Sequence, residues 1–340
     1  MKKLLKNKYL IIIPILILNI ISLFYLHTTP YFKRHLLYLF LSYLILFIFS
    51  KIKLKYIVKL LPYLYIISIF LLGLVLIVGR EIKGAKAWLH IYGLSIQPSE
   101  ITKLVLTIYL SYLTYKKKNF FYLTLITIIP SVLTFLEPDT GAIIFYFIIL
   151  LSVLKYTPKN KKWFRIGAFL LSIFIILNIS IYFINKDLLI NIYGTNLFYR
   201  IDRLISFKEG DNIQTVNSLI SIGSHELLYI PESHNDFIFA AIISKYSPCI
   251  FALIILSYIL IFFYFLKNTT KKKNMSNILN FTILNMLLFQ VFYNILMNLS
   301  LLPIIGIPLP FLSYGGSYLL TLYALIGLSV NLSKHPKIDK

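Results

Sequence analysis

Apolar runs that approach the length of a membrane span recur along most of this 340-residue chain. A helix needs about 20 apolar residues to cross the hydrocarbon core of a bilayer. Hydrophobic residues make up 59% of the chain and charged residues only 14%, a balance that argues against a soluble enzyme. The sequence therefore predicts an all-α polytopic membrane protein, a single integral membrane domain over residues 1–340 with about ten transmembrane helices. The predicted spans are 9–26, 36–50, 60–78, 99–115, 120–136, 141–156, 164–184, 249–266, 278–302 and 311–332.

Basic residues indicate how these spans are oriented. The chain has 34 lysine and arginine residues against 12 acidic ones, and most of the basic residues fall in alternate loops between the spans. Because cytoplasmic loops carry an excess of Lys and Arg, both termini are predicted to be cytoplasmic. The net charge of +22 then requires no nucleic-acid partner. The longest predicted extracytoplasmic loop, 185–236, lies between spans seven and eight.

Acidic residues fall almost entirely in the predicted outer segments, with Asp339 as the cytoplasmic exception. Two explanations remain open. The basic loops could simply leave acids to the other face, or carboxylate chemistry could take place at the outer face. The single cysteine, Cys249, excludes an intramolecular disulfide framework.

Polar residues inside the predicted spans are costly and therefore informative. Glu100 and Lys103 share one face of the fourth span, either as a structural ion pair or as the charged wall of a cavity that binds an anionic headgroup. Gln290, Asn294 and Asn298 recur every four residues on the ninth span, which favours hydrogen bonding between helices.

Three polar or irregular segments interrupt the outer ends of the spans. In the turn 137–141, Asp139 is a candidate helix cap, and in the turn 231–237 either Asn235 or Asp236 could cap the following helix. Residues 237–248 read as a short re-entrant segment. The prolines and glycines of 306–317 predict an irregular element, which is tolerated at membrane depth only when it is buried in protein or lines a wet cavity.

Taken together, four segments resemble the SEDS (shape, elongation, division and sporulation) family of polytopic peptidoglycan glycosyltransferases. They are 83–103 with its Gln-Pro-Ser-Glu-Ile-Thr-Lys stretch, Glu-Pro-Asp-Thr-Gly at 137–141, Pro-Glu-Ser-His-Asn-Asp-Phe at 231–237, and the Gly-Ile-Pro-Leu-Pro-Phe segment that begins at Gly306. The resemblance covers roughly residues 80–330. A very short N-terminal extension makes the chain more similar to the elongation (RodA-like) branch than to the division branch.

The resemblance implies polymerisation of lipid II into glycan strands at the outer face of a bacterial cytoplasmic (inner) membrane, in support of elongation and cell shape. Asp236 corresponds to the family's essential acid and would act as general base, with inversion at the donor anomeric carbon. A divalent cation such as Mg²⁺ or Mn²⁺ is a further expectation, with no organic cofactor. The implied substrate-binding residues are Glu100, Lys103, Trp88, Arg200, Arg203, Asp139 and His234. Trp88 could instead be an interfacial anchor.

Departures from the family pattern concern the loop around the acid. A Gly-rich stretch is missing before Pro231, and Asn235 stands where the family usually has Thr. The alternative function is a flippase for a lipid-linked precursor, or a non-catalytic scaffold for a class B penicillin-binding protein. That transpeptidase is also the partner that the resemblance implies for the enzyme, together with membrane proteins of the elongation complex.

Overall fold

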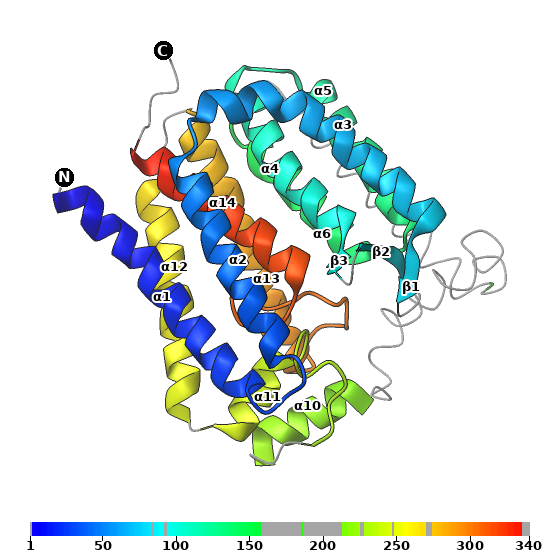
Figure 1. Ribbon diagram of the computed structural model, residues 1–340, viewed down its shortest axis with the longest axis vertical. Coiled ribbons are helices and arrows are strands. Elements are labelled where there is room, and N and C mark those ends of the chain that lie inside the picture. Colours follow the sequence, from blue (N-terminus) through cyan, green and yellow to red (C-terminus); the bar gives the residue numbers. More distant parts are fainter. Residues whose placement is uncertain are drawn as a thin grey trace.

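The fold of this protein, taken from a computed structural model, is a bundle of helices with a small β-sheet at one end (Figure 1). The structure describes residues 2–82, 85–91, 94–157, 185, 213–224, 228–246, 248–269 and 274–334. Its helices are α1 (Lys2–Leu26), α2 (Phe32–Lys51), α3 (Leu54–Val78), α4 (Pro98–Tyr115), α5 (Phe120–Leu136), α6 (Thr140–Leu154), α10 (Ile213–Ser224), α11 (Ile238–Lys245), α12 (Pro248–Asn268), α13 (Met275–Asn298) and α14 (Gly316–Lys334).

Most of the predicted spans coincide with these helices. The exception is 164–184, which lies outside the described residues. Among the described helices, α1, α2, α3, α12 and α13 are long and apolar enough to cross a membrane, whereas α5, α6 and α14 are shorter apolar helices. The protein is therefore a mostly helical chain with several candidate membrane spans, and ten spans remain a prediction.

Three helix pairs make the most extensive contacts, and in two of them the partners come from distant parts of the sequence. Helix α2 lies along α14, α3 along α4, and α1 along α12 (Figure 1). Buried polar contacts fix this arrangement: Asn19 of α1 donates from Nδ2 to the hydroxyl oxygens of Tyr43 on α2 and Tyr323 on α14, both at 2.6 Å. Such interhelical hydrogen bonds are a common way to specify packing where apolar surface alone cannot.

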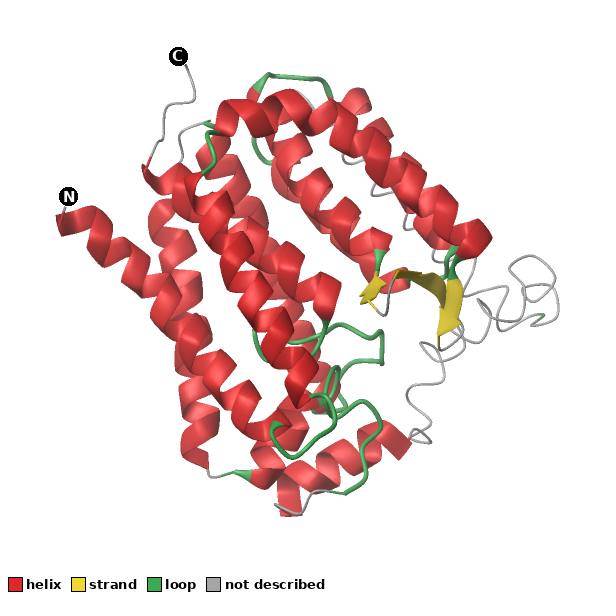
Figure 2. Cartoon of the chain, in the orientation of Figure 1, coloured by secondary structure: helices red, strands yellow, loops and turns green. Residues whose placement is uncertain are grey.

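A three-stranded antiparallel sheet corrects the all-α prediction (Figure 2). It consists of β1 (Arg80–Ile82), β2 (Ala85–Ile91) and β3 (Leu94–Ile96) in the loop between α3 and α4. Along β2, Ala87 and Leu89 are buried and His90 is exposed, the period-two pattern of a half-buried strand. The run is too short to be distinguished in sequence from the ends of the flanking spans.

The basic loops, predicted to be cytoplasmic, and the predicted outer segments lie at different ends of the helices. The start of α1, the end of α14 and the α2–α3 and α4–α5 connections lie toward the upper left and top of Figure 1, whereas α10 and α11 lie at the bottom and the strands lie on the right, at the other ends of α3 and α4. Which end faces the cytoplasm remains a prediction from the basic loops.

The long irregular segment between the last two helices is confirmed. Helix α13 ends at Asn298 and α14 begins at Gly316, five residues later than the predicted span. Ser300, Gly306 and Phe311 adopt positive φ angles, and Pro308 and Pro310 cannot donate the hydrogen bonds of a helix. The predicted re-entrant segment contains the eight-residue helix α11, whose residues Ile238–Ile242 are buried. Its re-entrant position in the membrane stays a prediction.

Candidate active site

Asp236 lies in the turn that leads into α11, but it does not cap that helix. The N-cap residue is Phe237, which makes no side-chain capping bond, so the capping hypothesis for Asn235 and Asp236 is wrong. Instead, Oδ1 of Asn298 on α13 accepts a hydrogen bond from the backbone N–H of Ala240 at 3.1 Å. The start of α11 is buried against α13, and that helix supplies the acceptor that a local cap would otherwise provide.

The backbone carbonyl of Asp236 is held by two asparagines of α13. Nδ2 of Asn294 donates to this oxygen at 2.8 Å and also to the carbonyl of Ile307 at 2.7 Å. Nδ2 of Asn298 donates to the same Asp236 oxygen at 3.0 Å. Both asparagines are fully buried, so losing either amide would take one of the two hydrogen bonds from the buried end of the Asp236 turn. We call this pair the α13 asparagine clamp.

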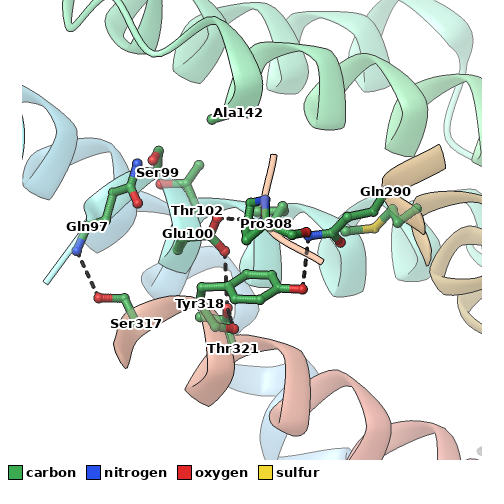
Figure 3. A network of polar contacts seen from close by, with 12 residues as sticks. Gln97, Ser99, Glu100, Thr102, Ala142, Gln290, Pro308, Ser317, Tyr318 and Thr321 are labelled. Carbon is green, nitrogen blue, oxygen red and sulfur yellow. Dashed lines mark hydrogen bonds and ion pairs between the residues drawn. The ribbon is translucent and has the colours of Figure 1, made fainter. Parts of the chain in front are cut away.

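Hydrogen bonding between helices, the role predicted for Gln290, Asn294 and Asn298, is thus only one of the roles of this polar stripe. Gln290 does bridge helices, because its Nε2 donates to the hydroxyl of Tyr318 on α14 at 2.9 Å. The same group donates to the carbonyl of Pro308 at 2.8 Å (Figure 3). The stripe therefore positions the irregular loop 299–315 and the turn that carries Asp236 against each other.

The loop 299–315 also contacts this turn directly. The backbone N–H of Tyr314 donates to the carbonyl of His234 at 3.0 Å, and Ser313 Oγ donates to the carbonyl of Asn235 at 2.7 Å. Gly306 has a φ of +71°, and a Cβ atom there would lie 3.4 Å from Oδ2 of Asp236. A side chain at position 306 would therefore be strained and would crowd the carboxylate.

Asp139 is confirmed as the cap of α6. Its Oδ1 accepts from the backbone N–H of Ala142 at 3.2 Å. Its Oδ2 accepts from Gln97 Nε2 and from Ser99 Oγ, both at 2.8 Å, so the carboxylate ties α6 to the start of α4. Because these bonds occupy both oxygens, the geometry supports a structural role for Asp139.

Glu137, in the same turn, is a buried carboxyl group that the sequence did not single out. The residue is fully buried, and neither carboxylate oxygen has a hydrogen-bond partner among the described residues. Burial, together with the neighbouring charge of Asp139, raises the pKa of Glu137 to about 8. The group is therefore mostly neutral at pH 7.

Glu137→Gln is expected to flatten the pH dependence of stability. Between the ordinary carboxyl pKa near 4.5 and about 8, the unfolded chain has released a proton that the folded protein still holds. Stability attributable to this group therefore falls as pH rises through that window and levels off above it. Melting temperatures in detergent at pH 5, 6, 7 and 8 should decline more steeply for the parent protein than for the variant. Parallel curves would show that Glu137 does not titrate in this range.

Glu100 and Lys103 form a buried ion pair, with Lys103 Nζ 2.7 Å from Glu100 Oε1. Thr321 on α14 donates to the other Glu100 oxygen at 3.3 Å (Figure 3). The ammonium group also lies 4.5 Å from the ring centre of Phe145 on α6 and 5.5 Å from that of Tyr318. The pair joins α4, α6 and α14. This burial supports the structural-pair interpretation, and contact with substrate stays a prediction.

Lys103→Met and the double change Glu100→Gln with Lys103→Met separate the two interpretations. Removing the lysine alone leaves a buried carboxylate unpaired, which costs roughly 3–5 kcal/mol of stability. The double variant removes both charges and should recover most of the lost melting temperature. If the pair is structural, activity should recover with it. A stable but inactive double variant would instead place the charges in the substrate site.

The remaining predicted residues are spread over several elements. Trp88 is half-buried in β2. The His234 ring stacks on Tyr31 at a centroid distance of 3.9 Å and lies 5.8 Å from the ring of Tyr314. Arg200 and Arg203 lie outside the described residues. Tyr31, the residue directly before α2, carried no signal in the sequence because its contact partner, His234, is distant along the chain.

A divalent-cation site does not emerge from the donors in the part of the chain that the structure describes. No group of three or more His, Cys, Asp or Glu side chains there is arranged to hold a metal ion. Among the described residues, the reactive group of the site is the Asp236 carboxylate, which lies where the turn 231–237 and the loop 299–315 are held together by hydrogen bonds.

Comparison with known proteins places this arrangement in a family. The model of the FtsW/RodA/SpoVE family, described as cell cycle proteins, matches residues 5–338. The chain belongs to this family. Among its relatives, the probable peptidoglycan glycosyltransferase FtsW of Buchnera aphidicola subsp. Schizaphis graminum is 34% identical, covering 93% of this chain and 96% of its own length. The FtsW of Wigglesworthia glossinidia brevipalpis is 31% identical over 91% of this chain.

Solved structures show the same fold for the family. A structure described as the structural coordination of polymerization and crosslinking by a peptidoglycan synthase complex matches with a TM-score of 0.80, at 22% identity, over 97% of this chain and 98% of its own. The rod shape determining protein RodA of Thermus thermophilus matches with a TM-score of 0.71 at 22% identity over the same shares. Family membership confirms the resemblance. The predicted similarity to the RodA-like branch is not supported by these relatives, which carry the FtsW name.

Proposed function

We propose that this protein is a peptidoglycan glycosyltransferase that polymerises lipid II at the outer face of the cytoplasmic membrane. The relatives named as probable peptidoglycan glycosyltransferases support the reaction class. The observation that carries the mechanism is the hold on Asp236, whose backbone is bound by two buried asparagines while its carboxylate lies next to Gly306. A rigid carboxylate is what a general base requires.

In the proposed step, the Asp236 carboxylate removes the proton from the 4-hydroxyl of the acceptor sugar. The hydroxyl oxygen attacks the anomeric carbon of the donor, and the bond from that carbon to the lipid diphosphate breaks with the electron pair. One displacement inverts the anomeric centre, in contrast to the double displacement of retaining enzymes.

The departing diphosphate carries negative charge that cations would stabilise. Lys103 is paired with Glu100 and buried, so it would have to leave that partner to reach the substrate. Arg200 and Arg203 are the other candidates, and Mg²⁺ or Mn²⁺ is a further proposed aid. Trp88 and His234 remain proposed binding residues.

Reconstitution tests the proposal directly. Purified protein supplied with labelled lipid II in detergent, alone and with a class B penicillin-binding protein, is expected to give a ladder of glycan strands. The partner is proposed because a peptidoglycan synthase complex shares this fold. Absence of polymer even with the partner would favour the flippase or scaffold alternative.

The cellular role is proposed separately from the chemistry. An elongation and shape role is one proposal, whereas the names of the relatives point to division. Depletion in the source bacterium distinguishes the two, because loss of a division enzyme gives filaments and loss of an elongation enzyme gives rounded cells.

A further inference from the structure

Helix α10 is amphipathic, with its apolar side exposed and its polar side buried, the reverse of an amphipathic helix in a soluble protein. Its apolar residues Ile213, Val216, Leu219 and Ile220 are 70%, 41%, 43% and 47% exposed. Its small polar residues Thr215, Ser218 and Ser221 are instead buried against the protein. Because these positions recur at helical spacing, the exposed residues form one continuous apolar face.

Hydrogen bonds explain why the polar face points inward. Ser218 Oγ donates to the carbonyl of Asn298 at 2.7 Å, and Ser300 Oγ donates to the carbonyl of Thr215 at 3.0 Å. The backbone N–H of Leu228 donates to Ser221 Oγ at 3.0 Å. Helix α10 is therefore fixed to the end of α13 through its polar side, and its apolar side has no cover among the described residues.

Orientation and composition indicate what covers this face. Figure 1 shows α10 lying across the lower end of the bundle, at a steep angle to α12 and α13. None of its twelve residues is charged. Two segments that are hydrogen-bonded to α10 also expose large side chains: Leu301, directly after Ser300, is 63% exposed, and Tyr229, whose carbonyl accepts from Asn217 Nδ2, is 82% exposed. A tyrosine beside an apolar face is typical of a membrane–water interface.

We propose that the apolar face of α10 lies in the outer leaflet of the membrane, so that α10 is an interfacial helix parallel to the bilayer plane. A helix across the ends of the spans meets the bilayer where headgroups give way to acyl chains, and an uncharged apolar face partitions there. Solvent exposure of so many adjacent apolar side chains is unusual for a surface facing water. The anchored helix would in turn brace the end of α13, which carries the asparagine clamp.

Site-specific quenching tests this placement independently of catalysis. In a Cys249→Ser background, Val216→Cys and Ile220→Cys are labelled with an environment-sensitive fluorophore and reconstituted into phosphatidylcholine nanodiscs. Phe263→Cys on the exposed face of α12 is the membrane control, and Lys118→Cys in the α4–α5 loop is the aqueous control.

The α10 positions are expected to be quenched by phosphatidylcholine carrying a doxyl group at acyl carbon 5, at least twofold more strongly than the aqueous control. Iodide should quench them less than it quenches that control. Strong quenching by iodide and none by doxyl lipid would overturn the proposal, because the face would then contact water. Protection from both quenchers would also overturn it, since a second copy or another protein would then cover α10.

Discussion

Asp236→Asn is expected to abolish glycan polymerisation while leaving insertion and folding intact. The change keeps the size of the side chain and removes the basic oxygen that the proposed step requires. General-base catalysis contributes roughly 10²–10⁴-fold to a rate, so at least a hundredfold loss is expected. The measurement is the initial rate of polymer formation from labelled lipid II, with the melting temperature in detergent as the check on folding.

Glu232→Gln provides the matched control for Asp236→Asn. Glu232 is a carboxylate in the same turn, and its side chain is half-buried like that of Asp236. Its replacement removes one negative charge from the turn without touching the proposed base, so the rate should fall less than tenfold. Equal losses in both variants would point to a general effect of charge and would remove Asp236 from the role of base.

Asn294→Leu and Asn298→Leu are expected to give the second-largest effect, through the position of Asp236. Each change removes a donor to the Asp236 carbonyl and leaves that buried oxygen with one bond fewer. A displacement of about 1 Å at a reacting group can cost on the order of 10²-fold in rate. We therefore expect kcat to fall about 10- to 100-fold, with a smaller change in the KM for lipid II.

Asn285→Leu is the control for the clamp, because it lies on the same helix and donates to Ser152 Oγ on α6 at 2.8 Å without touching the Asp236 turn. Its effect should appear in the melting temperature more than in kcat. Asn294→Gln tests the role further, since it retains an amide donor that can restore part of the rate. If Asn285→Leu lowers kcat as much as the clamp variants do, the asparagines stabilise the bundle and do not position the acid.

Features local in the sequence were the ones that could be predicted from it. The spans follow from long apolar runs, and the cap of α6 follows from Asp139 standing directly before the helix. The irregular segment follows from Pro308 and Pro310. Each of these depends on residues within a few positions of one another, where chain geometry alone restricts the structure.

Features that depend on distant partners could not be predicted. The sequence placed Asn294 and Asn298 on one helix face, but their acceptor at position 236 is about sixty residues away. The capping of α11 by Asn298 and the stacking of Tyr31 on His234 have the same origin. The strands were missed for another reason, because a short half-buried hairpin between two spans has a pattern that the neighbouring apolar runs obscure.

Accessibility of the Asp236 turn from outside the cell tests the central claim most directly. In the Cys249→Ser background, Asn235→Cys reports on the turn and Lys117→Cys reports on the α4–α5 loop, which the basic residues place in the cytoplasm. A membrane-impermeant maleimide added to intact cells with a permeable cell wall is expected to label position 235 at once and position 117 only after the membrane is opened. Labelling of 117 but not 235 in intact cells would put the carboxylate on the cytoplasmic side and contradict the proposed reaction.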